Sequence, residues 1–279
     1  MRCVVGTGPD DVRAHMSVPT TTPDETLPRV VEFLRAHGQR VAAIGVACFG
    51  PIDLDPRSKT FGRITTTPKP GWAGADVVGA LRTLRVPVAF DTDVNGAALG
   101  EHRWGTGRGS DPFVYVTVGT GVGGGAIVGG RAVHGLVHPE MGHIVIPRDA
   151  DDTFPGVCPF HAGCLEGLAS AVALRARWNA PPQTLPPEHE AWRREARYLA
   201  LGVAAIVAVL SPPRIAIGGG VMRAPGLLGC VRRELTAVLA GYVRPPELVA
   251  PALGERAGVL GAIALAHSVL DDREYNSAR

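Results

Sequence analysis

The segment from Pro139 to Gly167 constrains the fold of this chain more than any other, because it gathers side chains that bind metal ions. Cys158, His161 and Cys164 follow one another at C-x2-H-x2-C spacing, and His143 precedes them on what we expect to be an adjacent strand. Two thiolates and two imidazoles form a closed tetrahedral set that is typical of structural zinc. The alternative is that these are ordinary buried cysteines and loop histidines, but the spacing favours zinc.

Composition limits the classes of protein to which the chain can belong. Its 279 residues, 46% hydrophobic and 19% charged, suit two compact domains with sizeable cores. A formal charge of +2 gives no electrostatic reason to expect nucleic acid as a partner. We expect no membrane span, because no apolar stretch reaches the roughly 18 residues required. Five cysteines without a disulfide-like pattern indicate a cytoplasmic protein.

Alternating strand and helix patterns predict an α/β protein with a domain boundary near Ser110. Strands are expected at 1–8, 41–48, 86–90, 113–118, 126–128 and 214–217. Helices are expected at 22–38, 76–84, 93–104, 166–178, 189–210 and 257–270, with a further one opening near Pro225. Thr22 should cap the first helix with its side chain, as part of a capping box. The tail from Asp271 should fray.

A carboxylate stands at one of the strand-to-helix junctions. The strand at 86–90 runs into Asp91-Thr92-Asp93-Val94-Asn95, and a helix follows. Asp93 therefore lies at the carboxyl end of a strand, where open α/β sheets place ligands. An aspartate there can simply cap the helix. The functional interpretation is a general base that takes the proton of an attacking hydroxyl.

Two glycine-rich turns are candidates for binding a nucleotide. The run from Gly119 to Gly125 lies between two strands, so it is neither a dinucleotide fingerprint nor a P-loop, both of which open a helix. Backbone N–H groups can still approach an anion closely there, and Thr120 adds a hydroxyl donor. The run from Gly218 to Gly220 ends a strand and could let an adenosine lie against bare backbone. In either run, the glycines could instead be present only because the turn requires backbone conformations that other residues adopt poorly.

Two glutamates flank the metal-binding segment. Folding of that segment around a metal would bring the carboxylates of Glu140 and Glu166 to one edge of a cleft, where they could fix polyol hydroxyls. Taken singly, each could equally be a solvated surface residue.

Several motifs together carry a resemblance to a known family. They are the stretches from His138 to His143, from Cys158 to Gly167, from Asp91 to Glu101 and from Gly119 to Gly125. They look like those of the ROK family of sugar kinases, and more narrowly like its zinc-containing bacterial fructokinases. Shorter stretches at 49–53, 67–72 and 218–221 agree, so the likeness covers roughly residues 3–268.

The resemblance implies two domains of the actin-like, ribonuclease-H-like ATPase fold, with sugar and ATP in the cleft between them. The first domain would span 1–110, with the C-terminal helix (256–279) packing back on it, and the larger second domain, 111–255, would hold the zinc site. Relatives of this kind need magnesium with ATP and are commonly cytoplasmic homodimers.

The resemblance also assigns roles to residues. Asp93 would be the catalytic base. The sugar would lie near Asn95, Glu140, His143 and Glu166. The ATP would rest on Gly119, Thr120, Gly121, Gly218, Gly219 and Gly220. Zinc would be held by His143, Cys158, His161 and Cys164.

One departure from the family pattern concerns the start of the chain. The family opens with a strand and an acidic Gly-Gly-Thr-Lys turn that contacts the phosphates, whereas Arg2 begins what corresponds to the second strand. In this fold the missing strand lies inside the sheet, so its absence should leave two ladders of backbone groups unpaired and open an apolar face. We expect either that the chain is an incomplete version or that it has lost transfer activity.

The sequence thus predicts an ATP-dependent hexose kinase, foremost a fructokinase that converts D-fructose to fructose 6-phosphate. The alternatives are a sugar- or nucleotide-binding pseudokinase, and a glucokinase or N-acetylmannosamine kinase of the same family. The family also includes repressors with an N-terminal helix-turn-helix segment, for which we see no room ahead of Arg2.

Overall fold

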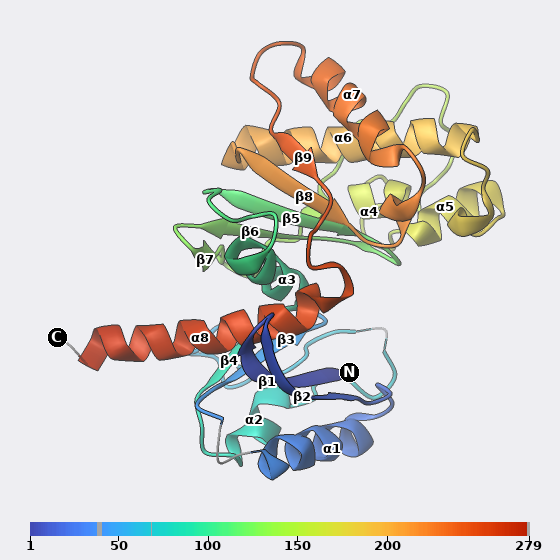
Figure 1. Cartoon of the computed structure of the whole chain (residues 1–279). Coiled ribbons are helices and arrows are strands. Elements are labelled where there is room, and N and C mark those ends of the chain that lie inside the picture. Colours follow the sequence, from blue (N-terminus) through green and yellow to red (C-terminus); the bar gives the residue numbers. More distant parts are fainter. Residues whose placement is uncertain (38–40, 68, 278–279) are drawn as a thin grey trace. The chain divides into compact units, whose positions relative to one another are not determined.

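The computed structural model describes residues 1–37, 41–67 and 69–277 (Figure 1). Gly38 and Pro68, which belong to predicted stretches, lie outside these residues. The chain divides into two compact units. Unit 1 comprises residues 1–104, 134–138 and 255–279, and unit 2 comprises 105–133 and 139–254. The division therefore falls before Gly105, and a short segment at 134–138 belongs to unit 1.

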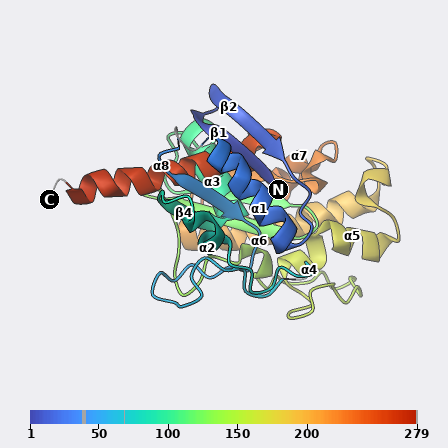
Figure 2. The ribbon, with the colours of Figure 1, turned by 90° about the horizontal axis from the view of Figure 1, so that it is seen from below.

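Unit 1 places strands between two groups of helices. Its elements are β1 (Arg2–Gly8), β2 (Asp11–Ser17), α1 (Pro23–Ala36), β3 (Ile44–Cys48), α2 (Val77–Arg82), β4 (Val88–Thr92), α3 (Asp93–Trp104) and α8 (Ala257–Ser277). Helix α8 packs on β1, β3 and β4 and against α3. Helices α1 and α2 lie on the other side of the strands, as the views in Figures 1 and 2 agree.

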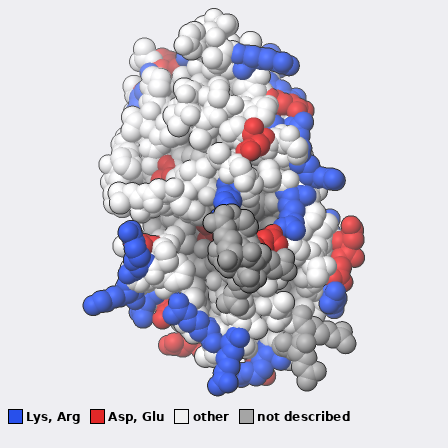
Figure 3. Space-filling model, turned by 90° about the vertical axis from the view of Figure 1, so that its left-hand side faces the viewer, with Lys and Arg blue, Asp and Glu red and all other residues white. Residues whose placement is uncertain are grey.

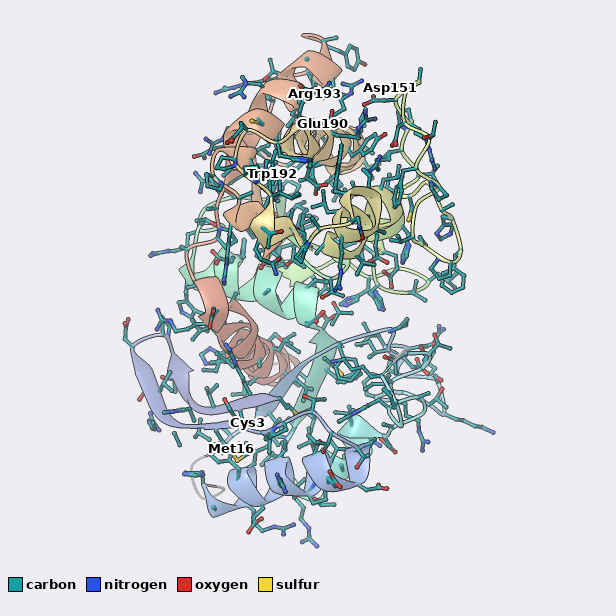
Figure 4. The ribbon with its side chains drawn as sticks, turned by 90° about the vertical axis from the view of Figure 1, so that its right-hand side faces the viewer. Cys3, Met16, Asp151, Glu190, Trp192 and Arg193 are labelled. Carbon is teal, nitrogen blue, oxygen red and sulfur yellow. The ribbon has the colours of Figure 1, made fainter. Side chains whose placement is uncertain are left out.

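In unit 1 one strand was missed and two local predictions are wrong. Strand β2 was not predicted, because its sequence is mostly polar and its side chains are largely exposed. It pairs antiparallel with β1, so that Cys3 lies opposite Met16 (Figure 4). The Thr22 side chain makes no capping hydrogen bond, although Pro23 does occupy the first turn. Helix α8 continues past Asp271 to Ser277 instead of fraying.

The strands of unit 1 form two separate sheets. In the described part of the chain, β1 pairs only with β2, and β3 pairs only with β4, in parallel. A cavity of about 440 Å³ is lined by both β1 and β3 and by α1 and α8. Its walls are mainly aliphatic, with Val5 and Val46 from the strands and Leu27 and Ala262 from the helices. An apolar cavity therefore lies between strands β1 and β3.

Unit 2 is built on one mixed sheet in the order β7-β6-β5-β8-β9. Its elements are β5 (Phe113–Val118), β6 (Val122–Val128), β7 (Arg131–Ala132), η2 (Met141–His143), α4 (Leu165–Ala169), α5 (Ala171–Trp178), η3 (Pro182–Thr184), α6 (Glu190–Leu210), β8 (Arg214–Gly218), η4 (Val221–Arg223), α7 (Leu227–Leu239) and β9 (Glu247–Val249). The short η5 (Gly254–Arg256) leads from it into α8. Strands β5, β8 and β9 are parallel, and β6 runs antiparallel to β5.

Burial explains this arrangement. Strands β5 and β8 are apolar along nearly their whole length, as expected for strands covered on both faces. Helices α6 and α7 pack together over one face of the sheet (Figure 1). The loop before α4 is tied to α6 by an ion pair of 2.9 Å between Asp151 and Arg194. Figure 4 shows Asp151 beside the first turns of α6, which carry Glu190, Trp192 and Arg193.

The helix predicted at 166–178 is in fact two helices. Ser170 is extended, with φ −78° and ψ 164°, and its hydroxyl accepts from Ala173 N to cap α5. The neighbouring Ala171 N donates to Gly119 O at 2.8 Å, which fixes the start of α5 against the first glycine turn. The break between α4 and α5 therefore frees the Ala171 N–H group to hold that turn in place.

Among the described residues, no helix combines the length and the apolar character that a membrane crossing requires. Basic and acidic side chains are interspersed on the face shown in Figure 3, in line with the small net charge of +2.

Candidate active site and metal cluster

The β4–α3 junction in unit 1 presents Asp93 as the first residue of the helix. Its carboxylate accepts from Val94 N at 2.9 Å. Asp93 is solvent-accessible but stands in the wall of the cavity described above, where water is partly excluded. This burial raises the pKa of Asp93, while the Val94 bond and the charges of Lys69 and His138 oppose the rise. An aspartate in such a setting can accept a proton near neutral pH.

Lys69 and His138 were not among the predicted site residues. Lys69 lines the same cavity as Asp93, and its Nζ lies 3.6 Å from the centre of the Phe49 ring. His138 is buried, next to Gly50. Both belong to stretches that carry the family resemblance, and this was the only sequence signal that pointed to them.

Asn95 is fully buried beneath this junction. Its Nδ2 donates to Asp91 Oδ1 at 2.8 Å, and its backbone N–H donates to Thr92 Oγ1 at 3.1 Å. Asn95 Oδ1 has no hydrogen-bond partner within the described chain. Asp91 Oδ2 lies 3.0 Å from His134 Nε2. Asn95 thus stabilises the β4–α3 junction through its hydrogen bonds to Asp91 and Thr92. Its Oδ1 is the side-chain atom that remains available to a ligand or a water molecule.

The two glycine turns lie side by side in unit 2. Gly119 follows β5 and Gly218 ends β8, and these strands are parallel neighbours, so both turns are at the same edge of the sheet. Gly219 has φ +97°, and a Cβ there would collide with the Val118 carbonyl. A Cβ at Gly119 or Gly220 would meet nothing within 4 Å. The turns therefore offer open, bare backbone that can receive an anion or a flat ring.

The side chains of His143, Cys158, His161 and Cys164 come together in unit 2. Their ligand atoms all lie within 4.8 Å of one another. The His143 Nδ1 atom is 3.7 Å from both Cys158 Sγ and Cys164 Sγ, and His161 Nδ1 is 3.7 Å from Cys158 Sγ. A tetrahedral ion with metal–sulfur bonds of about 2.3 Å and metal–nitrogen bonds of about 2.05 Å places sulfur and nitrogen about 3.6 Å apart. These residues therefore fit a tetrahedral metal ion.

Backbone pairing explains why residues distant in sequence converge at this cluster. Leu165 N donates to Ile144 O at 2.8 Å, which lays the His143 end of the segment against the Cys164 end. Burial raises the pKa of the Cys164 thiol. Metal ions bind the thiolate form of cysteine, so a cation at this cluster would counteract that rise in pKa.

Glu140 and Glu166 occupy different settings within unit 2. Glu140 is exposed and directly precedes η2, and its carbonyl accepts from His143 N at 2.9 Å. Glu166 is half-buried in α4, and its Oε2 accepts from Val122 N at 3.0 Å. One oxygen of Glu166 is therefore committed to the first glycine turn, which the sequence did not indicate.

Comparisons with known proteins agree on one family. The model of the ROK family matches residues 2–269. A fructokinase from Zymomonas mobilis is 46% identical over 261 residues, covering 89% of this chain and 87% of the relative. A fructokinase from Streptococcus mutans is 38% identical over 276 residues, covering 96% and 94%. The crystal structure of a ROK hexokinase from Thermus thermophilus matches with a TM-score of 0.80 at 27% identity, covering 98% of this chain and 100% of that one.

Proposed function

Because the chain belongs to the ROK family, we propose that it is an ATP-dependent hexose kinase that converts D-fructose to fructose 6-phosphate. The observation that carries this proposal is the 46% identity to a fructokinase over 89% of the chain. Its fold agrees, since the two-unit α/β architecture matches ROK sugar kinases of the actin-like ATPase fold.

Asp93 is the catalytic base in this proposal. It accepts the proton of the sugar hydroxyl, whose oxygen then attacks the γ-phosphorus of ATP, and the bond to the β-phosphate oxygen breaks to release ADP. The raised pKa of Asp93 makes it a better proton acceptor than an aspartate with the ordinary pKa, provided that the pH keeps it ionised. The activity should therefore fall as the pH decreases through that pKa.

The glycine turns hold the nucleotide. Backbone N–H groups at Gly119 to Gly121 and the Thr120 hydroxyl would bind the triphosphate, and the open backbone at Gly218 to Gly220 would receive the adenosine. Magnesium would accompany the triphosphate and offset its charge. Support for this role comes from the position of both turns at one sheet edge.

Zinc is the metal that best suits the cluster of two cysteines and two histidines. It would be structural, because all four positions are filled by the protein. Around it, Glu140, Glu166 and the Nε2 atom of His143 would bind sugar hydroxyls, with Asn95 supporting the base. The second oxygen of Glu166, which makes no bond to Val122, is the one available for a hydroxyl.

A coupled ADP-release assay of the purified chain with fructose, glucose and mannose tests the reaction. We expect the highest kcat/KM with fructose. Asp93→Asn should lower kcat by a factor of about 10² to 10⁴. The matched control, Asp55→Asn, changes an exposed aspartate of the same unit and should leave kcat unchanged. Turnover of glucose in preference to fructose would overturn the substrate, and turnover of no hexose would overturn the kinase.

The cellular setting is also part of the proposal. All five cysteines are free thiols in the described structure, which suits the reducing cytoplasm. We expect a homodimer, as the family resemblance implies. Light scattering that gives the mass of a single chain at assay concentration would contradict it.

A further inference from the structure

A buried hydrogen-bond network lies behind the proposed base. The Asp91 carboxylate is 4% exposed and receives three hydrogen bonds. Oδ1 accepts from Thr92 N at 2.7 Å and from Asn95 Nδ2 at 2.8 Å. Oδ2 lies 3.0 Å from His134 Nε2 and has no other partner among the bonds of the described chain. A buried carboxylate requires such donors, so each one stabilises the junction.

The direction of the His134 bond follows from the network. The Asn95 amide donates through Nδ2 to Asp91, and the same Nδ2 is 3.5 Å from His134 Nε2. A flipped amide would instead place Asn95 Oδ1 against the carboxylate, which is repulsive. Since a carboxylate oxygen accepts, we assign a hydrogen to His134 Nε2, which donates it to Asp91 Oδ2. The bond also raises the pKa of His134, against the effect of its burial.

His134 does not come from the β4–α3 region. It begins the 134–138 segment, which follows β7 and belongs to unit 1 although the residues on either side belong to unit 2. Its side chain is 42% exposed, so it contributes little to the core. Within the described part of unit 1, the polar contacts of its ring are with Asp91 and Asn95.

We propose that His134 is a positioning residue for the transfer reaction, because its Nε2–H bond to Asp91 fixes the junction that carries Asp93. The inference rests on the proposed function, in which Asp93 is the base. Asp91 and Asp93 are separated only by Thr92, whose hydroxyl caps α3 by accepting from Asn95 N. A shift of Asp91 toward a new donor would move Thr92, and with it the base. A displacement of about 1 Å at a reacting group can cost about 100-fold in rate.

Substitutions at position 134 can distinguish the effect of the hydrogen bond from the effect of side-chain size. Glutamine places its amide nitrogen where Nε2 stands, whereas asparagine places it where Nδ1 stands. We expect H134N and H134A to lower kcat by about 10- to 100-fold, with KM for ATP within about twofold of the unsubstituted chain. H134Q should keep kcat within about threefold. The melting temperatures of H134Q and H134N should be similar, since both side chains are polar and partly exposed.

A double-mutant cycle tests whether His134 acts through Asp91. D91N should lower kcat, and adding H134A to D91N should lower it no further, because the bond is already altered. Additive losses, or an H134N variant as active as H134Q, would overturn the inference. D93N is assayed in parallel. An inactive D93N with a fully active H134A refutes the inference alone, while an active D93N refutes the proposed base and the inference with it.

Discussion

The metal cluster allows a prediction whose size can be worked from the structure. Cys164→Ser removes one of the four ligands while keeping an oxygen that can accept from Gly167 N, as Cys164 Sγ does at the start of α4. A bound ion would tie His143 to Cys164 across a sequence separation of 21 residues. Treated as a cross-link that closes a loop of this length, the tie stabilises the folded chain by about 3 kcal/mol. For a unit of this size, that corresponds to a melting temperature about 6 to 12 °C lower in the variant.

The assay compares metal content and thermal unfolding. We expect close to one zinc per chain by mass spectrometry, and a zinc-specific chelator should lower the melting temperature of the unsubstituted chain by a similar amount. Cys164→Ser should melt at the same temperature with and without chelator. The matched control is Cys230→Ser, which changes a half-buried cysteine of α7 outside the cluster and should retain both zinc and chelator sensitivity.

Three results would refute this reasoning. The first is a preparation that contains no metal, and the second is a chelator that leaves the melting temperature of the unsubstituted chain unchanged. The third is a loss of stability in Cys164→Ser that still responds to chelator, because the effect would then come from the cap of α4 rather than from the ion.

Other predictions follow from single positions. Glu195 is buried, and burial raises its pKa well above the ordinary value, so the unfolded chain loses this proton at a lower pH than the folded one. The free energy of unfolding measured in urea should therefore fall as the pH rises above about 4.5, and Glu195→Gln should remove that part of the decline. An equally steep pH dependence in both proteins would contradict this. Gly219→Ala should cost at least about 1 to 2 kcal/mol, because φ is +97° and the new Cβ meets Val118. Gly220→Ala should melt normally but bind ATP more weakly by calorimetry, and unchanged affinity would exclude this backbone from the nucleotide site. In hydrogen exchange, the amides of β1 and β3 should exchange faster than those of β5, which is paired on both sides, and equal protection would show that the separate sheets are not the solution state.

Much of the fold was predictable where one physical signal dominates. The apolar runs of β3 and β5 indicated strands, although β3 is only half-buried at its centre, and the spacing of Cys158, His161 and Cys164 by itself indicated a common ligand. The family was predictable because its motifs occur in order. Strand β2 was missed because a polar strand on an exposed edge has no hydrophobic pattern. The break at Ser170 was missed because it depends on a bond from Ala171 to a turn 52 residues earlier, at Gly119.

The candidate site was predictable in its residue types but not in its contacts. Asp93 could be placed at a strand-to-helix junction from sequence alone. Nothing in the spacing showed that Asn95 is buried, or that Asp91 is held by His134 from 43 residues away. Such contacts depend on where a distant segment of the chain packs, for which local sequence carries no signal.

The position of Glu166 connects two features that the sequence presents separately. It lies two residues after the cluster cysteine Cys164, on the first turn of α4, and its carboxylate bonds Val122 N at the end of the first glycine turn. The side chain also lies so close to Gly121 that a Cβ there would collide with it. An ion at the cluster would fix the start of α4, α4 fixes Glu166, and Glu166 fixes the turn proposed to bind phosphate. A structural metal can thus affect transfer without touching either substrate. Glu166→Gln tests this link, because it preserves the shape of the side chain and all four cluster ligands but weakens a charge-assisted bond, and we expect a higher KM for ATP at unchanged melting temperature.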